Sequence, residues 1–149
     1  MEFVIRPERY SVMSYAPKLK NLVVVRSLTK FFGYPGVRLG FLVGNEYIVK
    51  NLFMQKEPWT VNSFALLAGK LSINNEEFIT NSRDYINKEK IFLYNELTAI
   101  TGIWPFEPSV NFLLIKITDD RFKASTVYDE LIKYGIVVRN CLNFPSLSA

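Results

Sequence analysis

The first half of the chain contains two short apolar runs, separated by a loop with two glycines and a proline. Residues 21–27 (NLVVVRS) are rich in β-branched side chains, and residues 37–43 (VRLGFLV) repeat this character. Runs of this length between turn-forming residues are typical of strands. Gly44 and Asn45 mark a turn after the second run. We therefore predict two strands joined by the glycine-rich loop.

In residues 46–100, apolar residues recur mainly at helical spacing. Residues 46–55 predict a short helix that ends before Pro58, and Thr60 is the expected N-cap of a second helix through Leu71. One long helix is expected over residues 75–100, where Gly102 ends it. Its apolar stripe, typical of a face that packs on a core, is formed by Phe78, Tyr85, Ile86, Phe92, Leu93, Leu97 and Ile100.

The C-terminal part predicts a small α/β unit. After an extended connection, residues 111–117 (NFLLIKI) indicate a strand, residues 124–134 a helix closed by Gly135, and residues 136–141 a further strand. The final residues, NFPSLSA, form no closing element, and the chain opens directly into a turn-like stretch. We therefore expect a fragment with unpaired strand edges, which self-associates or exposes an apolar patch.

Composition narrows the class of function. The 149 residues are 49% hydrophobic and 15% aromatic, enough for a folded core, and the net charge of +4 comes from scattered basic residues. We expect neither a nucleic-acid partner nor a membrane one, since no apolar run approaches the ~20 residues of a membrane helix. The single Cys141 favours a cytoplasmic protein. The absence of histidine argues against Ser-His-Asp catalysis and the usual metal sites, so we expect no metal.

The stretch SLTKFFGYPGVRLG, residues 27–40, contains the candidate chemistry. Lys30 follows the first predicted strand, Arg38 opens the second, and Ser27 precedes the lysine by three positions. A hydroxyl, a guanidinium and an amine at strand ends favour an anion pocket. A lysine beside another cation and partly removed from water more readily presents the neutral amine that forms an imine. The residues alone also allow a solvated surface lysine, with Arg38 in an ordinary ion pair.

The pattern S-x-x-K-x-x-G-x-x-G-x-R-x-G resembles the lysine signature of class I and II aminotransferases, which use pyridoxal 5′-phosphate (PLP). The resemblance implies that Lys30 is the Schiff-base lysine and moves a proton at the substrate Cα. It implies that Ser27 and Arg38 bind the PLP phosphate. It also implies an α/β fold of the aspartate-aminotransferase type. In that fold, residues 1–74 end the large PLP-binding domain, 75–101 form a connecting helix, and 102–149 belong to the small C-terminal domain.

Two further stretches are similar to one branch of this family, the threonine-phosphate decarboxylases and histidinol-phosphate aminotransferases. EPWTVNSFALLAG (57–69) and VVRNCLNFPSL (137–147) favour the decarboxylases, although Ser146 replaces a glycine of their pattern. The resemblance implies that Arg139 contacts the phosphate of the substrate and that Asn111 and Trp59 lie at the substrate site. Each has a structural alternative: a strand-end ion pair for Arg139, a strand-start cap for Asn111, and a core position for Trp59.

The family's remaining site residues have no counterpart in this sequence. The aspartate that binds the PLP pyridine nitrogen, the ring-stacking residue and the phosphate-cradling helix would precede residue 1, and the arginine for the substrate carboxylate would follow residue 149. The resemblance thus implies a homodimeric parent enzyme that acts on a small phosphorylated amino acid or amine, by decarboxylation or by transamination. For the chain itself we expect no activity. A non-catalytic folded module is the remaining hypothesis.

Overall fold

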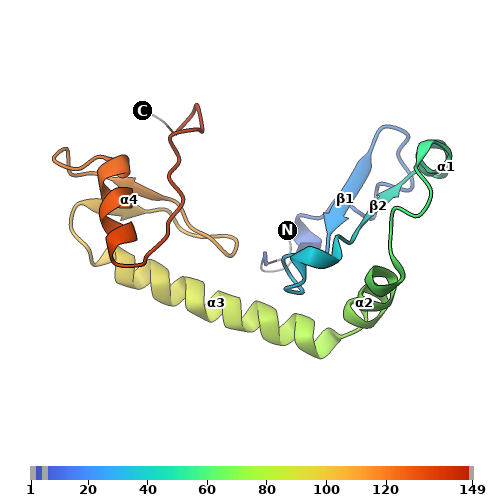
Figure 1. Cartoon of the computed structure of the whole chain (residues 1–149), viewed down its shortest axis with the longest axis horizontal. Helices are drawn as coiled ribbons and strands as arrows, with labels where there is room; N and C mark the ends of the chain where they lie inside the picture. Colours follow the sequence, from blue (N-terminus) through green and yellow to red (C-terminus); the bar gives the residue numbers. More distant parts are fainter. Residues whose placement is uncertain (1–2, 5–6, 148–149) are drawn as a thin grey trace. The chain divides into compact units, whose positions relative to one another are not determined.

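A computed structural model describes residues 3–4 and 7–147 of the chain. The chain forms two compact units, Met1–Asn87 and Lys88–Ala149, which divide within one long helix. No helix in the described part of the chain is both long and apolar enough to cross a membrane. The elements, in chain order (Figure 1), are η1 (Pro7–Arg9), β1 (Val23–Ser27), η2 (Pro35–Val37), β2 (Gly40–Gly44), α1 (Glu46–Gln55), α2 (Ser63–Ile73), α3 (Glu76–Thr98), β3 (Ile103–Pro105), β4 (Ile115–Ile117) and α4 (Ala124–Lys133).

The first unit is built on an antiparallel hairpin of β1 and β2. The ladder runs from Val23 opposite Gly44 to Ser27 opposite Gly40, and the Leu28 amide extends it by donating to the Leu39 carbonyl at 3.1 Å. Both predicted strands are confirmed. The second starts at Gly40 instead of residue 37, because η2 and the left-handed backbone of Arg38 occupy the preceding positions.

The Gly40→Ala variant should unfold at a lower denaturant concentration than wild type. A Cβ at this position would lie 2.7 Å from the Arg26 carbonyl oxygen, a backbone atom of the paired strand that cannot rotate away. Overpacking of this kind typically costs about 1–3 kcal/mol. Urea unfolding measures the change. The matched control is Gly44→Ala in the same strand, whose added Cβ makes only ordinary contacts at 3.5 Å and beyond; equal losses for the two variants would contradict the argument.

Two short helices follow the hairpin. α1 occupies the predicted residues, and the Asn45 side chain caps it by accepting from the Tyr47 amide at 3.0 Å. The predicted cap of α2 was wrong: Asn62, not Thr60, accepts from the Ala65 amide at 2.8 Å. The helix starts later because Trp59 has a left-handed backbone, with φ of 53°.

α2 packs closely on the segments that flank the loop between β1 and β2. Gly69 lies so near Leu39 that a Cβ would meet its Cδ2 atom at 2.5 Å, and Leu28 lies at 4.0 Å. The loop is also held by an aromatic cluster. The rings of Phe31 and Phe32 lie 6.4 and 5.7 Å from that of Phe78 at the start of α3. The loop after Lys30 is therefore anchored within the first unit from two directions.

The second unit pairs β3 with β4 antiparallel, from Ile103 opposite Ile117 to Pro105 opposite Ile115. Only residues 115–117 of the predicted 111–117 strand enter a ladder, and β3 lies where we expected an extended connection. α4 confirms the predicted helix, which ends before Gly135 with φ of 74°. Residues 136–141 form no strand, because no neighbouring strand pairs with them in the described part of the chain. The predicted β-α-β unit was therefore wrong in its last strand, and its first strand is confirmed over residues 115–117 only.

A carboxylate and an arginine close the turn after β4. Asp119 accepts from Nε and Nη2 of Arg121, the shortest contact being 2.6 Å, and also from the Arg121 amide at 3.0 Å. These hydrogen bonds from Arg121 hold the pKa of the Asp119 carboxyl below its usual value. The turn also bonds to the start of β3, since the Asp119 amide donates to the Gly102 carbonyl at 3.3 Å.

Asp119→Asn should therefore destabilise the chain at neutral pH and have less effect in acid. The folded-state pKa is lower than the unfolded value of about 3.9, so ionised Asp119 stabilises the fold above that value, and the contribution is lost as the pH falls through the folded-state pKa. Urea midpoints of wild type and variant, compared from neutral to acid pH, measure this. Asp120→Asn, at the exposed neighbouring position, is the control. A difference that grows as the pH falls would contradict the assignment.

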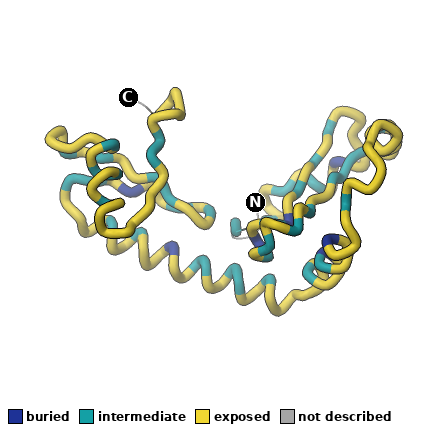
Figure 2. Tube along the Cα trace, viewed as in Figure 1, coloured by how far each residue is buried: buried dark blue, intermediate teal, exposed yellow. Residues whose placement is uncertain are grey.

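Few side chains are buried. Ala16, Leu28, Phe31 and Ala65 belong to the core, whereas large apolar residues such as Val25, Met54 and Phe64 are 72%, 83% and 83% exposed. Figure 2 shows that exposed positions predominate along the described chain. Exposed apolar surface of this extent is typical of surfaces that bind a partner or aggregate. The expectation of exposed apolar surface is confirmed, and self-association stays a prediction.

Candidate functional site

The hairpin of β1 and β2 brings three of the predicted site residues to one end. Ser27 is the last residue of β1, and Arg38 precedes the first residue of β2, Gly40, by two positions. Because Ser27 lies opposite Gly40 in the ladder, the loop that contains Lys30 leaves and returns at this end. The side chains of Ser27, Lys30 and Arg38 are all exposed to solvent there. The local fold thus presents a hydroxyl, an amine and a guanidinium together.

The backbone of the loop forms a compact turn around Lys30. The Gly33 amide donates to the Lys30 carbonyl at 3.3 Å, and the Tyr34 amide donates to the Thr29 carbonyl at 3.0 Å. Gly33 has φ of 67°, a conformation that favours glycine and lets the backbone turn sharply there. An added Cβ at Gly33 or Gly36 would meet no atom within 4 Å, so the loop leaves room for a ligand near its backbone.

Arg38 is held in an uncommon conformation. Its backbone is left-handed, with φ of 57° and ψ of 50°, and its Nη1 atom donates to the Pro35 carbonyl at 3.1 Å. Within the described residues, neither Arg38 nor Lys30 forms an ion pair with an acidic side chain. The alternative of an ordinary ion pair for Arg38 therefore finds no acidic partner in the part of the chain that the structure describes. Strained backbone is typical of ligand-binding positions, and a guanidinium with unused donors fits an anion.

Ser27 is linked to a residue that the sequence analysis did not single out. Its Oγ atom lies 2.8 Å from Oγ1 of Thr29 and accepts from the Thr29 amide at 3.3 Å. The only signal in the sequence was the spacing of two hydroxyl residues ahead of Lys30. The partial burial of Lys30, which we expected to favour its neutral amine, is not provided by the residues described here, where its side chain is exposed.

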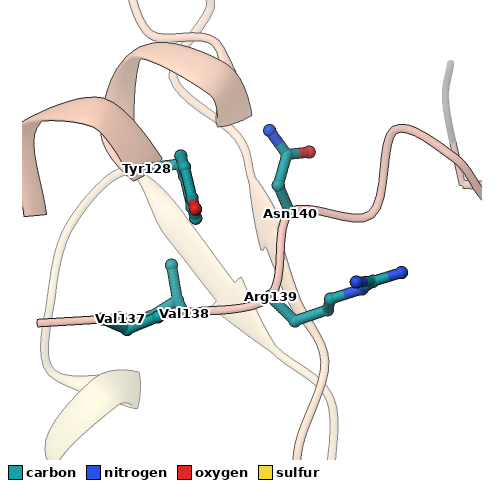
Figure 3. Close-up of a pocket in the computed structure, with 5 residues that line it drawn as sticks. All are labelled: Tyr128, Val137, Val138, Arg139 and Asn140. Atoms are coloured by element: carbon teal, nitrogen blue, oxygen red, sulfur yellow. The ribbon is translucent and has the colours of Figure 1, made fainter. Parts of the chain in front are cut away.

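Arg139 lies in the second unit, beside an open hollow of about 420 Å³ lined by Tyr128, Val137, Val138, Arg139 and Asn140. Its side chain extends away from Tyr128 (Figure 3). Nη2 donates to the Asn143 side chain at 3.1 Å, and the guanidinium lies 5.6 Å from the centre of the Phe144 ring. Arg139 thus makes no strand-end ion pair in the described chain; an amide and a ring orient an exposed cation instead.

The two remaining predicted residues are separate from these groups along the chain. Asn111 is exposed in the irregular segment before β4, so it caps no strand start. Trp59 is 95% exposed, which rules out the core position in this structure, and its left-handed backbone is a second strained position besides Arg38. Trp59 belongs to the first unit, whereas Asn111 and Arg139 belong to the second.

Comparison with known proteins identifies the family. The family profile for Aminotransferase class I and II matches residues 1–147. A protein of Caldanaerobacter subterraneus subsp. tengcongensis, with the provisional name threonine-phosphate decarboxylase, is 37% identical over 147 residues, which cover 97% of this chain and 39% of the relative. The chain therefore belongs to the class I and II aminotransferases, and it spans about two fifths of that relative's length.

Solved structures show the same fold. The histidinol-phosphate aminotransferase of Clostridium acetobutylicum superposes with a TM-score of 0.84 at 32% identity, over 92% of this chain and 41% of that one. The histidinol-phosphate aminotransferase of Sinorhizobium meliloti, solved in complex with PLP, gives a TM-score of 0.80 at 16% identity, over 93% and 37% of the two chains. The expected fold, a part of the PLP-dependent aminotransferase-like α/β architecture, is confirmed, and PLP is the cofactor of this family.

The groups at the hairpin end fit such a cofactor chemically. A serine hydroxyl and a guanidinium with unused donors suit a phosphate ester, and a primary amine suits an aldehyde carbon. Ser27, Arg38 and Lys30 supply these groups from one loop and its two flanking strands.

Proposed function

We propose that this chain supplies the cofactor lysine of a PLP-dependent enzyme that acts on a phosphorylated α-amino acid or amine, in the manner of threonine-phosphate decarboxylase. The observation that carries the proposal is the loop at the hairpin end: Ser27 ends β1, Lys30 and Arg38 follow in the loop that returns to β2, and neither cation has an acidic partner within the described residues. The similarity to a protein with that name, over 97% of the chain, supports the substrate class.

Each side chain has a distinct role in this proposal. Lys30 would hold PLP through its amine, and that amine would carry a proton to or from the substrate Cα. Ser27 and Arg38 would donate hydrogen bonds to the cofactor phosphate. When bound, PLP supplies the electron sink for cleavage at Cα. Arg139 binds the phosphate of the substrate, and Asn111 and Trp59 line its site.

The chain alone represents only part of a complete site. We propose that residues 1–74 end the large domain, 75–101 form the connecting helix and 102–149 belong to the small domain of a cytoplasmic homodimer, with no nucleic-acid or membrane partner. Its relatives are about two and a half times longer, as the 39% and 41% coverage shows. Groups for the pyridine nitrogen and for the substrate carboxylate have no counterpart by family position among these residues. We therefore propose that the 149-residue chain is catalytically inactive by itself.

Transamination is the second candidate reaction, because the solved histidinol-phosphate aminotransferase superposes with a TM-score of 0.84. The two reactions differ in the bond that breaks at Cα. Decarboxylation of threonine phosphate releases CO₂ and leaves an amino alcohol phosphate, whereas transamination of histidinol phosphate leaves a carbonyl product and transfers the amino group to the cofactor. A product assay on the full-length parent protein with both substrates separates them. We expect CO₂ and the amino alcohol phosphate; a carbonyl product alone would favour transamination.

A non-catalytic folded module is the third candidate, and the exposure of Lys30 supports it. Such a module would have no specific reaction with PLP. Reduction of the chain in the presence of PLP separates this candidate from the proposal, because only a positioned amine reacts in preference to other exposed lysines.

A further inference from the structure

Thr29 lies in the sequence between Ser27 and Lys30, two of the residues that the proposed function uses. Its amide donates to Ser27 Oγ at 3.3 Å, its hydroxyl lies 2.8 Å from the same oxygen, and its carbonyl accepts from the Tyr34 amide at 3.0 Å. The residue thus connects the serine hydroxyl at the end of β1 to the turn that contains Lys30. Thr29 is half-buried, whereas Ser27 and Lys30 on either side are exposed.

The hydrogen-bond capacity of the two hydroxyls limits what they can do. A serine hydroxyl has one proton to donate and two lone pairs that accept. The Thr29 amide occupies one lone pair of Ser27 Oγ, and a proton from the Thr29 hydroxyl can occupy the other. When the Thr29 hydroxyl is the donor in this pair, both acceptor sites of Ser27 Oγ are occupied, and Ser27 has its own proton left to donate. Arg38, in the loop that returns to this end of the hairpin, adds a positive charge. An arrangement of this kind suits an anion that accepts hydrogen bonds and donates none.

We propose that Thr29 is a positioning residue, whose hydroxyl and amide fix Ser27 Oγ so that its proton is donated to a phosphate group bound at this end of the hairpin. The inference rests on the proposed function for the identity of the bound phosphate as part of PLP. The contact of Thr29 with the phosphate is indirect and runs through Ser27.

The test uses inorganic phosphate as the probe on the full 149-residue chain. Isotope-labelled protein is titrated, and the amide resonance of Thr29 reports binding next to Ser27. Thr29→Val keeps the shape of the side chain and removes its hydroxyl, so Ser27 Oγ is no longer fixed. Phosphate should then bind about tenfold more weakly, which is the effect of losing one hydrogen bond to a charged group, here the bond from Ser27. Thr29→Ser restores the hydroxyl and should bind within about twofold of wild type, well inside the scatter of such contacts. Amide spectra confirm that each variant is folded.

A positioning role also predicts non-additivity. In a Ser27→Ala background, Thr29→Val should cause no further loss of phosphate affinity, because the group that Thr29 positions is already gone. A full loss in that background, equal binding by wild type and Thr29→Val, or no phosphate response of wild type would each overturn the inference. Covalent attachment of PLP to Lys30, followed separately, tests the proposed function. Attachment without any effect of Thr29→Val would overturn only the inference, and a Thr29-dependent phosphate response without attachment would overturn only the function.

Discussion

The substitution Lys30→Arg should abolish the specific covalent attachment of PLP to this chain. Arginine keeps the positive charge at the hairpin end, so electrostatic attraction for the phosphate remains, but a guanidinium stays protonated and cannot attack the aldehyde. The chain is incubated with PLP and reduced with borohydride, and the mass of the intact protein is measured. The wild type should gain one cofactor, and the variant should fall to the background of random surface labelling.

The matched control for this experiment is Lys50→Arg. Lys50 is an exposed lysine on α1, paired with Glu46 at 2.7 Å, and has no place in the proposed site. This variant should be labelled as fully as wild type. Equal labelling of Lys30→Arg and wild type would show that the S-x-x-K pattern does not mark the reactive lysine of this chain.

The second large effect that we expect is that the isolated chain turns over substrate far more slowly than a complete enzyme. A complete enzyme of this type needs a reactive lysine, a phosphate site, a partner for the pyridine nitrogen and a cation for the substrate carboxylate. In the proposed site, Lys30, Ser27 and Arg38 supply the first two, and Arg139 is assigned to the substrate phosphate. Loss of one preorganised electrostatic group typically costs about 10²–10³ in rate, and here at least two are without a counterpart.

We therefore expect turnover of threonine phosphate, with excess PLP, to be lower than that of a typical enzyme by a factor of at least about 10⁴. Turnover of histidinol phosphate, which has no carboxylate, should be lower by a factor of at least about 10². The full-length parent protein, assayed in parallel, is the positive control. Turnover by the isolated chain within about tenfold of the typical ~10 per second would show that groups within the chain, or from a second copy, complete the site.

Local sequence patterns predicted the elements that depend on local interactions. The helix at 46–55 was correct because Asn45 caps it, and the end of α4 was correct because Gly135 adopts positive φ. The strand at 136–141 failed because a strand needs a partner, and the apolar run gives no information on whether one is present. The strand β3 was missed because a run of three residues ending in Pro105 gives too weak a pattern.

In the candidate site, too, features set by local sequence could be predicted, and features set by distant segments could not. Spacing in the sequence selected Ser27, Lys30 and Arg38, and the hairpin register explains why the loop that contains Lys30 and Arg38 starts and ends next to Ser27. The left-handed backbone of Arg38 and of Trp59 was beyond prediction, since neither is glycine and nothing in their immediate neighbours demands positive φ. The exposure of Lys30 could not be predicted either, because burial of a loop depends on segments distant in sequence.

Peptide mapping after reduction tests the central claim most directly. The wild-type chain is incubated with PLP, reduced with borohydride, digested and analysed by mass spectrometry, so that even a weak linkage is converted into a stable one. The account predicts that the cofactor is found on the peptide that contains Lys30. Label spread over Lys18, Lys20 and Lys50, with no preference for Lys30, would contradict it.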